Sequence, residues 1–253
     1  YGTAIVGTVS CTSISFGSPV VFETAEVQDV AITFDSNSNK IVIAYADEGN
    51  SSHGTAIVGT VSGTSISFGS AVVFEAAVVF LAGASKDMNR PVIDPNNNKV
   101  IIAYSNGTNG TKAEARVGTI SGTGISFGTA VVFSSGTAES YTGGAYHAGI
   151  QKVVFAYRDN TSSTLTGKYN VGTVSGTDIS FSGEVIFNAG RADNISLVYD
   201  PDSTNLVNSF EDNANSSYGT SQVFSPSVTN LTATNFIGIS DSAISSGATG
   251  KAT

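Results

Sequence analysis

Residues 54–74 read GTAIVGTVSGTSISFGSAVVF, and the same phrase returns three more times in this chain of 253 residues. The other copies are GTAIVGTVSCTSISFGSPVVF at 2–22, ARVGTISGTGISFGTAVVF at 115–133 and YNVGTVSGTDISFSGEVIF at 169–187. Successive copies start 52, 59 and 54 residues apart, counted from Val6, Val58, Val117 and Val171. A period of about fifty residues is typical of propellers and other repeat arrays.

Each repeat divides into four short runs with strand patterns, here called runs C, D, A and B in chain order. Run C is Thr3–Ser10 and run D is Ile14–Phe22, and a tight Ser-Cys-Thr or Ser-Gly-Thr turn between them predicts a hairpin. Run A (29–35) and run B (40–47) are separated by a polar turn rich in Asn, Asp and Pro. Glycine recurs inside runs C and D, which predicts bulges or close backbone approach between sheets.

The order of the runs predicts an all-β fold, a β-propeller with four-stranded blades. The chain supplies C-D, then A-B-C-D three times, then A-B and one surplus C-like run at 219–224. The opening C-D and the closing A-B would complete one another, so we expect four blades, closed by strands from both termini. Closure would remove the exposed sheet edges that promote aggregation. A five-bladed ring and an open β-array are the alternatives.

The domain prediction is a repeat domain at 1–224 followed by a Ser/Thr-rich tail or linker at 225–253, which would lead to a further domain. The chain begins inside a repeat, so we expect it to be part of a longer protein. It has one cysteine, which excludes an intrachain disulfide framework, and it has no apolar run long enough to insert into a membrane. Eleven Lys and Arg against twenty Asp and Glu give a net charge of −9, which argues against a nucleic-acid partner.

The ends of the B runs carry the candidate ligand-binding residues. An aromatic residue and an Asp or Asn recur two positions apart and so share one strand face. A ring of such pockets would suit a sugar, which has an apolar face and a hydroxyl rim. The alternative is that the aromatic packs between blades and the Asp or Asn caps the next loop. The candidate residues are Tyr45, Asp47, Tyr104, Asn106, Tyr157, Asp159, Phe210 and Asp212.

No motif predicts a catalytic residue, a metal site or a cofactor. The Asp-rich turns after Asp35, Asp94 and Asp200 superficially resemble calcium loops, but they lack the spaced ligands closed by a Glu, so we interpret them as Asx-turns. The two histidines, His53 and His147, have no partner at metal-ligand spacing. Carboxylates are numerous, and the sequence singles out no acid/base pair among them.

The phrase GTAIVGTVSGTSISFG…AVVF, followed by D-x-N-x-NKVVIAY-D, resembles a repeat of predicted marine bacteriophage tail-fibre or receptor-binding proteins and of marine bacterial surface proteins. The resemblance covers residues 1–224. It implies a virion or surface adhesin, placed outside the cell or on the virion surface, and it implies no catalytic residues.

The sequence therefore predicts a virion-associated structural or adhesin module that binds cell-surface carbohydrate weakly at several sites. Several weak pockets on one rigid object would raise its avidity. Its partners would be glycans, other virion proteins or further copies of itself. The first alternative is a purely structural spacer or decoration protein without a ligand. The second is a glycan-cleaving enzyme, which would need two carboxylates about 5–10 Å apart in one cleft.

Overall fold

The computed structural model describes residues 1–76, 90–138, 140–161 and 165–226. Over these ranges the chain forms 21 β-strands and three short 3-10 helices, so the predicted all-β fold is confirmed. No helix in the described ranges is long and apolar enough to cross a membrane. The strands fall into five units that follow the sequence repeat, called units 1 to 5 below.

Unit 2 shows the complete plan of one repeat. Its strands are β5 (Val27–Asp35), β6 (Lys40–Asp47), β7 (His53–Ser62), β8 (Ser65–Phe68) and β9 (Val72–Glu75), with the helix η1 (Glu48–Asn50) between β6 and β7. The order across the sheet is β5-β6-β7, and the second half of β7 pairs with β8 while its first half pairs with β9. Runs A, B and C are therefore single strands, whereas run D is two strands with a bend between them.

Units 3 and 4 repeat this plan. Unit 3 comprises β10 (Arg90–Asp94), β11 (Lys99–Asn106), η2 (Gly107–Asn109), β12 (Lys112–Ser121), β13 (Gly124–Phe127) and β14 (Val131–Thr137). Unit 4 comprises β15 (Ser140–His147), β16 (Lys152–Arg158), β17 (Thr166–Ser175), β18 (Asp178–Phe181) and the first part of the long strand β19 (Val185–Asp200). The second part of β19 is run A of unit 5, so one strand links the sheets of these two units.

The two end units are incomplete. Unit 1 has only runs C and D, which form β1 (Gly2–Ala4), β2 (Gly7–Ser10), β3 (Ser13–Phe16) and β4 (Val20–Glu23). Unit 5 has the second part of β19, then β20 (Asn205–Asp212), η3 (Asn213–Asn215) and β21 (Tyr218–Phe224). The last described strand thus ends at Phe224, and residues 227–253 of the predicted tail lie outside the described residues.

Run B decides how the units stack, because both of its faces are buried. Ile43 and Tyr45 on β6 pack against unit 1, where they contact Ala4 and Phe22. Val42 and Ala44, on the opposite face of β6, pack against residues of unit 3 that include Tyr104. Units 3 and 4 and units 4 and 5 share apolar cores of the same kind. Each sheet therefore lies face to face with the next along the chain.

The glycine in run D allows this close stacking. A methyl group on Gly17, Gly69 or Gly128 would lie about 2 Å from the carbonyl oxygen of Thr64, Thr123 or Thr177, at the hairpin tip of the following unit. The same glycines donate their N–H to run C of their own unit, as in Gly69 N to Val58 O at 3.0 Å. The predicted close approach of backbones is confirmed, and it explains why run D bends at this residue.

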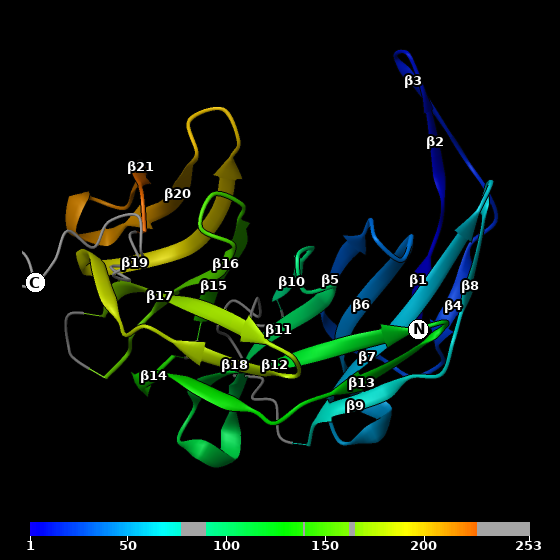
Figure 1. The fold of residues 1–253 in the computed structure, drawn as a ribbon, viewed down its shortest axis with the longest axis horizontal. Coiled ribbons are helices and arrows are strands. Elements are labelled where there is room, and N and C mark those ends of the chain that lie inside the picture. The colour runs from blue at the N-terminus through cyan, green and yellow to red at the C-terminus, as the bar shows by residue number, and fades with distance from the viewer. Residues whose placement is uncertain (77–89, 139, 162–164, 227–253) are drawn as a thin grey trace, which may run out of the picture.

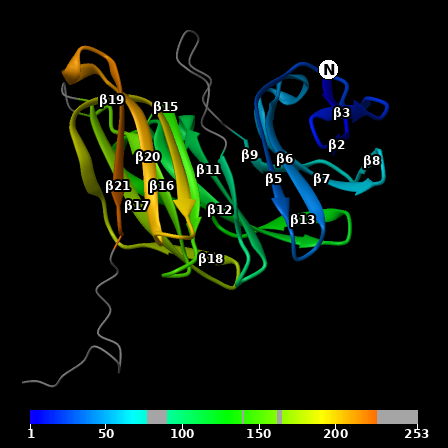
Figure 2. The ribbon, with the colours of Figure 1, turned by 90° about the horizontal axis from the view of Figure 1, so that it is seen from above.

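The stacked units form a row with unit 1 at one end and unit 5 at the other (Figures 1 and 2). Among the described strands, β1 pairs only with β4 and β2 only with β3, while β20 pairs with β19 and β21. The expected closure of the ring by opening and closing strands of one chain is therefore absent from the described residues. The surplus run at 219–224 already occupies the edge of β20 that the opening strand was expected to fill.

Candidate functional site

The aromatic residues predicted to bind a sugar lie inside the junctions between units. Tyr45, Tyr104 and Tyr157 are all 0% exposed. Each ring packs on a phenylalanine from run D of the preceding unit, with centroids 5.3 Å apart for Phe22–Tyr45, 5.3 Å for Phe74–Tyr104 and 5.4 Å for Phe133–Tyr157. Phe210 packs in the same way on Phe187, at 5.2 Å. No face of these tyrosine rings is open to a ligand. The rings pack between units, which is the alternative drawn from the sequence.

The Asp and Asn residues at the ends of the B runs act as caps. Asp47, Asn106 and Asp212 accept a hydrogen bond from the backbone N–H two residues ahead and so begin η1, η2 and η3. Asp159 accepts one from Thr161 N at 2.8 Å. The turns after Asp35, Asp94 and Asp200 are Asx-turns with N–H to carboxylate distances of 3.0–3.1 Å, as predicted. The described residues contain no group of three His, Cys, Asp or Glu that could hold a metal ion.

The hydroxyls of Tyr45 and Tyr104 connect neighbouring units through a glutamate, whereas the hydroxyl of Tyr157 binds a glutamate of its own unit. Tyr45 donates to Glu23 at 3.4 Å, and Tyr104 donates to Glu75 at 3.2 Å. Both glutamates directly follow the phenylalanine of run D in the preceding unit. At the next junction Ser134 stands at this place in the repeat, and Glu184 of unit 4 supplies the carboxylate instead, 2.5 Å from the hydroxyl of Tyr157. The interaction is kept although the glutamate comes from another strand.

Burial raises the pKa of all three tyrosines. For Tyr45 and Tyr157 the neighbouring carboxylates raise the pKa further, because a negative charge opposes formation of a second one. For Tyr104 the hydrogen bond and charge of Arg116 act in the opposite direction, but burial prevails. The hydroxyls therefore stay protonated and serve as hydrogen-bond donors.

The junction between units 2 and 3 brings two glutamates to one hydroxyl. Glu75 and Glu114 each accept a hydrogen bond from the Tyr104 hydroxyl at 3.2 Å. Arg116 donates to the same hydroxyl at 3.1 Å and forms an ion pair with Glu75 at 3.4 Å. Asn106 donates to Glu114 at 2.9 Å. One hydrogen-bonded cluster at this junction thus contains Glu75, Tyr104, Glu114, Arg116 and Asn106.

The junction between units 3 and 4 holds two carboxylates around a lysine. Lys168 forms ion pairs with Asp159 and with Glu184, the latter at 3.1 Å. Burial tends to raise the pKa of both carboxyl groups, but hydrogen bonds from Lys168 and Thr161 to Asp159, and from Ser135 and Tyr157 to Glu184, lower both pKa values overall. Burial tends to lower the pKa of Lys168, and the two carboxylates raise it overall. All three groups are charged at neutral pH, so neither acid is suited to donate a proton.

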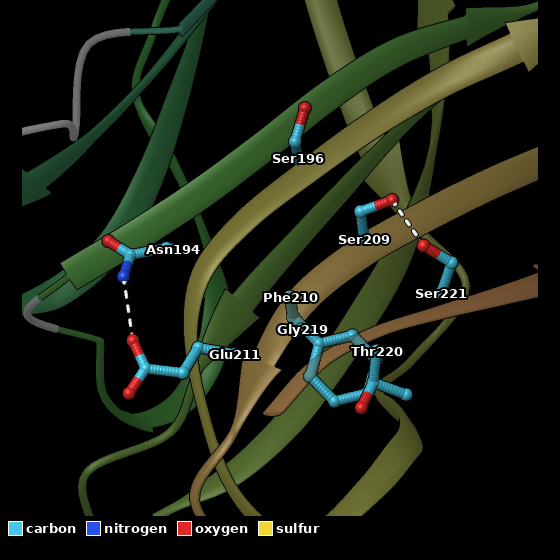
Figure 3. A pocket seen from close by; sticks show the side chains of 8 residues that line it. All are labelled: Asn194, Ser196, Ser209, Phe210, Glu211, Gly219, Thr220 and Ser221. Carbon is cyan, nitrogen blue, oxygen red and sulfur yellow. Dashed lines mark hydrogen bonds between the residues drawn. The ribbon is translucent and has the colours of Figure 1, made fainter. Parts of the chain in front are cut away.

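Two shallow cavities lie on the described surface. One, of about 340 Å³, lies at the junction of units 3 and 4 and is lined by residues that include Phe133, Asn170 and Glu184. The other, of about 260 Å³, lies on the outer face of unit 5 (Figure 3). There Asn194 bonds to Glu211 at 3.0 Å, and the hydroxyls of Ser209 and Ser221 are 2.8 Å apart. Of the predicted site residues, only Phe210 lines either cavity.

Sequence reasoning missed the charged partners of the tyrosines. Glu75, Glu114, Arg116, Lys168 and Glu184 were not singled out. One signal was present for the glutamates, because a Glu follows the last phenylalanine of run D in the first two copies. Another was present in run C, where Ile57 is replaced by Arg116 and then by Asn170, which are polar residues at an apolar strand position.

Comparisons with known proteins place the chain in no family. No family model matches it, and no curated protein matches it. Among solved structures it is similar to an exo-β-1,3-galactanase from Phanerochaete chrysosporium crystallised with β-1,3-galactotriose, with a TM-score of 0.44 and 10% identity. The alignment covers 84% of this chain and 48% of the galactanase, so the chain spans about half the length of that protein.

The prediction of a virion-associated adhesin is contradicted by this comparison, because the structure to which the chain is similar is a glycan-cleaving enzyme and not a virion protein.

Proposed function

We propose that this chain is a structural repeat module, a rigid scaffold of the β-propeller type whose polar side chains join neighbouring blades instead of acting on a substrate. In this proposal each unit is one blade, with run A innermost. The face-to-face stacking of the sheets supports it, as do the contacts between the A strands of successive units. It corresponds to the first alternative drawn from the sequence, a structural protein without a ligand.

The observation that carries this proposal is that the carboxylates at the junctions are held by neighbouring side chains. Glu23 and Glu75 accept a tyrosine hydroxyl from the following unit, and Glu184 accepts hydrogen bonds from Tyr157 of its own unit and from Ser135 of the preceding one. Asp159 and Glu184 form ion pairs with Lys168. Groups held in ion pairs and hydrogen bonds of this kind stabilise a fold. A catalytic acid would instead need its pKa raised toward the working pH. The pKa values of Asp159 and Glu184 are shifted in the opposite direction.

The test is to measure stability and activity together in the variant Glu75→Gln. We expect the full chain to release no reducing sugar from a panel of oligosaccharides that includes a β-1,3-galactan. We expect Glu75→Gln to lower the free energy of unfolding by about 1–1.5 kcal/mol, because the partly buried hydrogen bond from Tyr104 keeps only a neutral acceptor and the ion pair with Arg116 is lost. Glu26→Gln serves as the matched control, the same exchange at an exposed position. Turnover by the wild type that Glu75→Gln abolishes without loss of stability would overturn the proposal.

A second candidate function, a glycan-cleaving enzyme, is favoured by one observation. Glu75 and Glu114 share the Tyr104 hydroxyl, so their carboxylate oxygens lie within twice 3.2 Å of each other. Retaining glycosidases hold two carboxyl groups about 5–5.5 Å apart, and inverting ones about 6.5–9.5 Å. Against it, neither glutamate lines the two cavities described above. Glycan turnover that is lost in both Glu75→Gln and Glu114→Gln would establish this function, and turnover unchanged in both would remove it.

A further inference from the structure

The junction between units 4 and 5 differs from the others because it holds buried polar groups without a partner. Among the described residues, five fully buried side-chain nitrogen or oxygen atoms make no hydrogen bond. Four of them belong to His147, Asn208 and Gln222 at this junction, and the fifth, the Tyr146 hydroxyl, lies on the face of β15 that packs against unit 3. A buried polar group without a partner destabilises the closed packing, since it has given up its hydrogen bonds to water.

An asparagine lies in the middle of this junction. The side chain of Asn208 is 0% exposed, and both its oxygen and its nitrogen are unpaired. It stands at the place in the repeat of Ile43, which is buried against the preceding unit. Gln222 lies opposite Asn208 on β21, so both amides are directed into the junction. Leu206 and Phe210, the neighbours of Asn208 on this face of β20, belong to the apolar core shared with unit 4, in which an amide is costly to bury.

A histidine lies in the same junction, at the end of β15. His147 stands at the place in the repeat of Asp35 and Asp94, whose carboxylates accept backbone N–H groups of the turns that follow. His147 is instead 3% exposed, and its Nδ1 has no partner. Its ring packs on Tyr199 of unit 5, with centroids 4.8 Å apart. The imidazole is therefore buried between units 4 and 5.

The surroundings of His147 favour its neutral form. Burial lowers the pKa of His147, and a backbone hydrogen bond opposes this only in part. Its Nδ1 binds no charged group. The titratable groups on the strands packed against this end of β15 are Lys152 opposite it on β16, Asp94 on β10, and Tyr199 and Asp200 on β19, while Glu211 and Asp212 lie at the far end of β20. Asp94 and Asp200 accept hydrogen bonds within their own turns.

The link that joins the earlier units is also missing here. At the first three junctions a glutamate accepts the hydroxyl of a buried tyrosine, but Phe210 stands at this place and has no hydroxyl. A buried ion pair between Arg158 of unit 4 and Asp193 of unit 5 crosses the junction. The strand β19 also connects the two units, and its pairing with β17 skips Ala189 and Gly190. An interruption of this kind lets a strand bend.

We propose that the junction between units 4 and 5 is a hinge of the fold, which opens while the other junctions stay closed, and that protonation of His147 favours the open form. Opening bends β19 at Ala189 and Gly190 and gives the two amides and the imidazole access to water. Water then satisfies these groups, so opening costs less here than at a junction of apolar residues. The closed form keeps His147 neutral, so it loses stability as the pH falls below about 6.5, the ordinary pKa of histidine.

The inference adds one movable junction to the scaffold proposed above. A scaffold and an enzyme could both contain such a hinge, so the activity assay above and the tests below fail independently. Between pH 7.5 and 5.5 most carboxyl groups stay charged, because their ordinary pKa values are about 4. The side chains that change charge in this range are therefore His147 and His53, and His53 lies in unit 2 at the start of β7.

Three equivalent alanines give a matched test of opening. Ala44, Ala103 and Ala156 occupy the same place in run B, are 0% exposed and face the following unit. Each is changed to cysteine in turn, in the full chain with Cys11→Ser, and the rate of thiol labelling is divided by that of the unfolded chain. At pH 7.5 we expect Ala156→Cys to be labelled about tenfold faster or more than Ala44→Cys and Ala103→Cys. Equal rates at the three positions would mean that labelling requires global unfolding, which would overturn the proposal.

The second test exchanges the buried amides. Asn208→Ile/Gln222→Ile introduces the isoleucines that unit 2 has at these places, and it should slow the labelling of Ala156→Cys about tenfold or more. The converse variant Ile102→Asn places an amide at the junction of units 2 and 3. It should speed the labelling of Ala44→Cys about tenfold or more, but not that of Ala103→Cys. Unchanged labelling of Ala156→Cys in the isoleucine variant, or of Ala44→Cys in the asparagine variant, overturns the proposal.

The third test is the pH dependence of opening. Between pH 7.5 and 5.5 the normalised labelling of Ala156→Cys should rise about three- to tenfold, because one proton is taken up when the junction opens. Labelling of Ala44→Cys should not rise, although His53 lies in the same unit. His147→Phe keeps a ring against Tyr199 and should remove the rise at Ala156→Cys. The proposal is overturned if labelling of Ala156→Cys is independent of pH, or if the rise persists in His147→Phe.

Discussion

The two ends of the row of units differ in the polarity of the strand faces that they expose. On the outer face of unit 5, Ser209 and Ser221 stand where Ala44 and Ala56 of unit 2 are completely buried under unit 3. At the other end, Val30, Ile32 and Phe34 of unit 2 stay apolar although they are exposed. A terminal repeat needs a polar outer face for solubility. The C-terminal end has part of such a face, whereas the N-terminal end retains the character of an internal junction.

This difference shows which interactions hold the row of units together. The first three junctions along the chain bury a tyrosine, a phenylalanine and small residues, and a glutamate accepts the tyrosine hydroxyl. The junction of units 4 and 5 has Phe210 in place of the tyrosine. At each end of the row, only one of the two sheets that would form such a junction is present among the described residues. The contribution of a residue to stability should therefore depend on its junction more than on its type, and equivalent positions in different units give matched tests.

The largest effect is expected from Tyr104→Ala, at an internal junction. Its ring is fully buried against Phe74, and its hydroxyl connects Glu75, Glu114 and Arg116. Removing a large buried aromatic side chain costs about 3–5 kcal/mol. Urea unfolding would measure this loss. Phe34→Ala, on the exposed face of β5, should change the free energy of unfolding by less than about 0.5 kcal/mol. Equal losses in the two variants would contradict the contrast between junction and end.

Alkaline pH should weaken the internal junctions next. The pKa values of Tyr45, Tyr104 and Tyr157 are raised in the folded state, mainly by burial. Their contribution is therefore complete below the ordinary tyrosine pKa of about 10, and it is lost as the pH rises from there through the folded-state pKa values. Each tyrosine can remove up to about 1.4 kcal/mol of stability per pH unit above 10. Three tyrosines together would remove about 4 kcal/mol by pH 11, which urea titrations from pH 8 to 11 would measure.

The control for this pH dependence is Tyr157→Phe. It removes one ionising group, so stability should fall less steeply above pH 10 than in the wild type, although the lost hydrogen bond to Glu184 lowers stability at neutral pH. An unchanged slope in the variant would mean that Tyr157 ionises as readily in the folded chain as in the unfolded one.

Matched serine and alanine exchanges should have a smaller effect. Ala44→Ser places a hydroxyl in a fully buried junction, and an unpaired buried hydroxyl costs about 1–3 kcal/mol. Ser209→Ala, at the same position of unit 5, should change stability by less than about 0.5 kcal/mol because its hydroxyl is exposed. In the double variant Ala44→Ser/Ala56→Ser the two hydroxyls face one another, as Ser209 and Ser221 do, so it should lose less than the sum of the single changes. An additive loss, measured by urea unfolding, would mean that the buried pair forms no hydrogen bond.

The repeat plan was predictable from sequence because it depends on local signals. Alternating apolar residues mark runs B and C, polar turns after Asp35 and Asp94 mark the A–B hairpins, and Gly17 and Gly69 mark close backbone approach. The bend in run D was not predicted, because it is caused by Thr64 and its equivalents in the following unit, about fifty residues away. The glutamates were hidden for a similar reason, since Glu23 and Glu75 lie in the preceding unit, 22 and 29 residues before the tyrosine that they bind.

The burial of the aromatic residues of the predicted ligand site was hidden for a related reason. Tyr45 and Asp47 share a strand face, as expected, but spacing along a strand does not reveal whether that face meets solvent or another sheet. In this chain the adjacent sheet covers it. The replacement of Glu75 by Ser134 and Glu184 could not be read from the alignment of copies either, because the new carboxylate comes from a different strand. The packing of the units decides which residues face each other across a junction, and the repeat of the sequence does not reveal it.

The smallest effect is expected at Cys11, at the tip of the hairpin formed by β2 and β3 in unit 1. Its φ is +52°, where the other hairpins have Gly63, Gly122 and Gly176 at +58° to +62°. A side chain in this left-handed conformation costs about 1 kcal/mol. Cys11→Gly should therefore stabilise this hairpin and slow hydrogen exchange of its amides about fivefold. Because every residue of β2 and β3 is exposed, global unfolding should change little.

The counterpart of this change is Gly63→Ala at the tip of an equivalent hairpin in unit 2. A methyl group there meets no atom within 4 Å, so only the backbone conformation is strained. Hydrogen exchange of the amides of β8 should become about fivefold faster. If Cys11→Gly slows exchange in unit 1 and Gly63→Ala speeds it in unit 2, the turn residue acts alike in both hairpins. If only the second change has an effect, the hairpin of unit 1 is already open and its turn residue does not limit exchange.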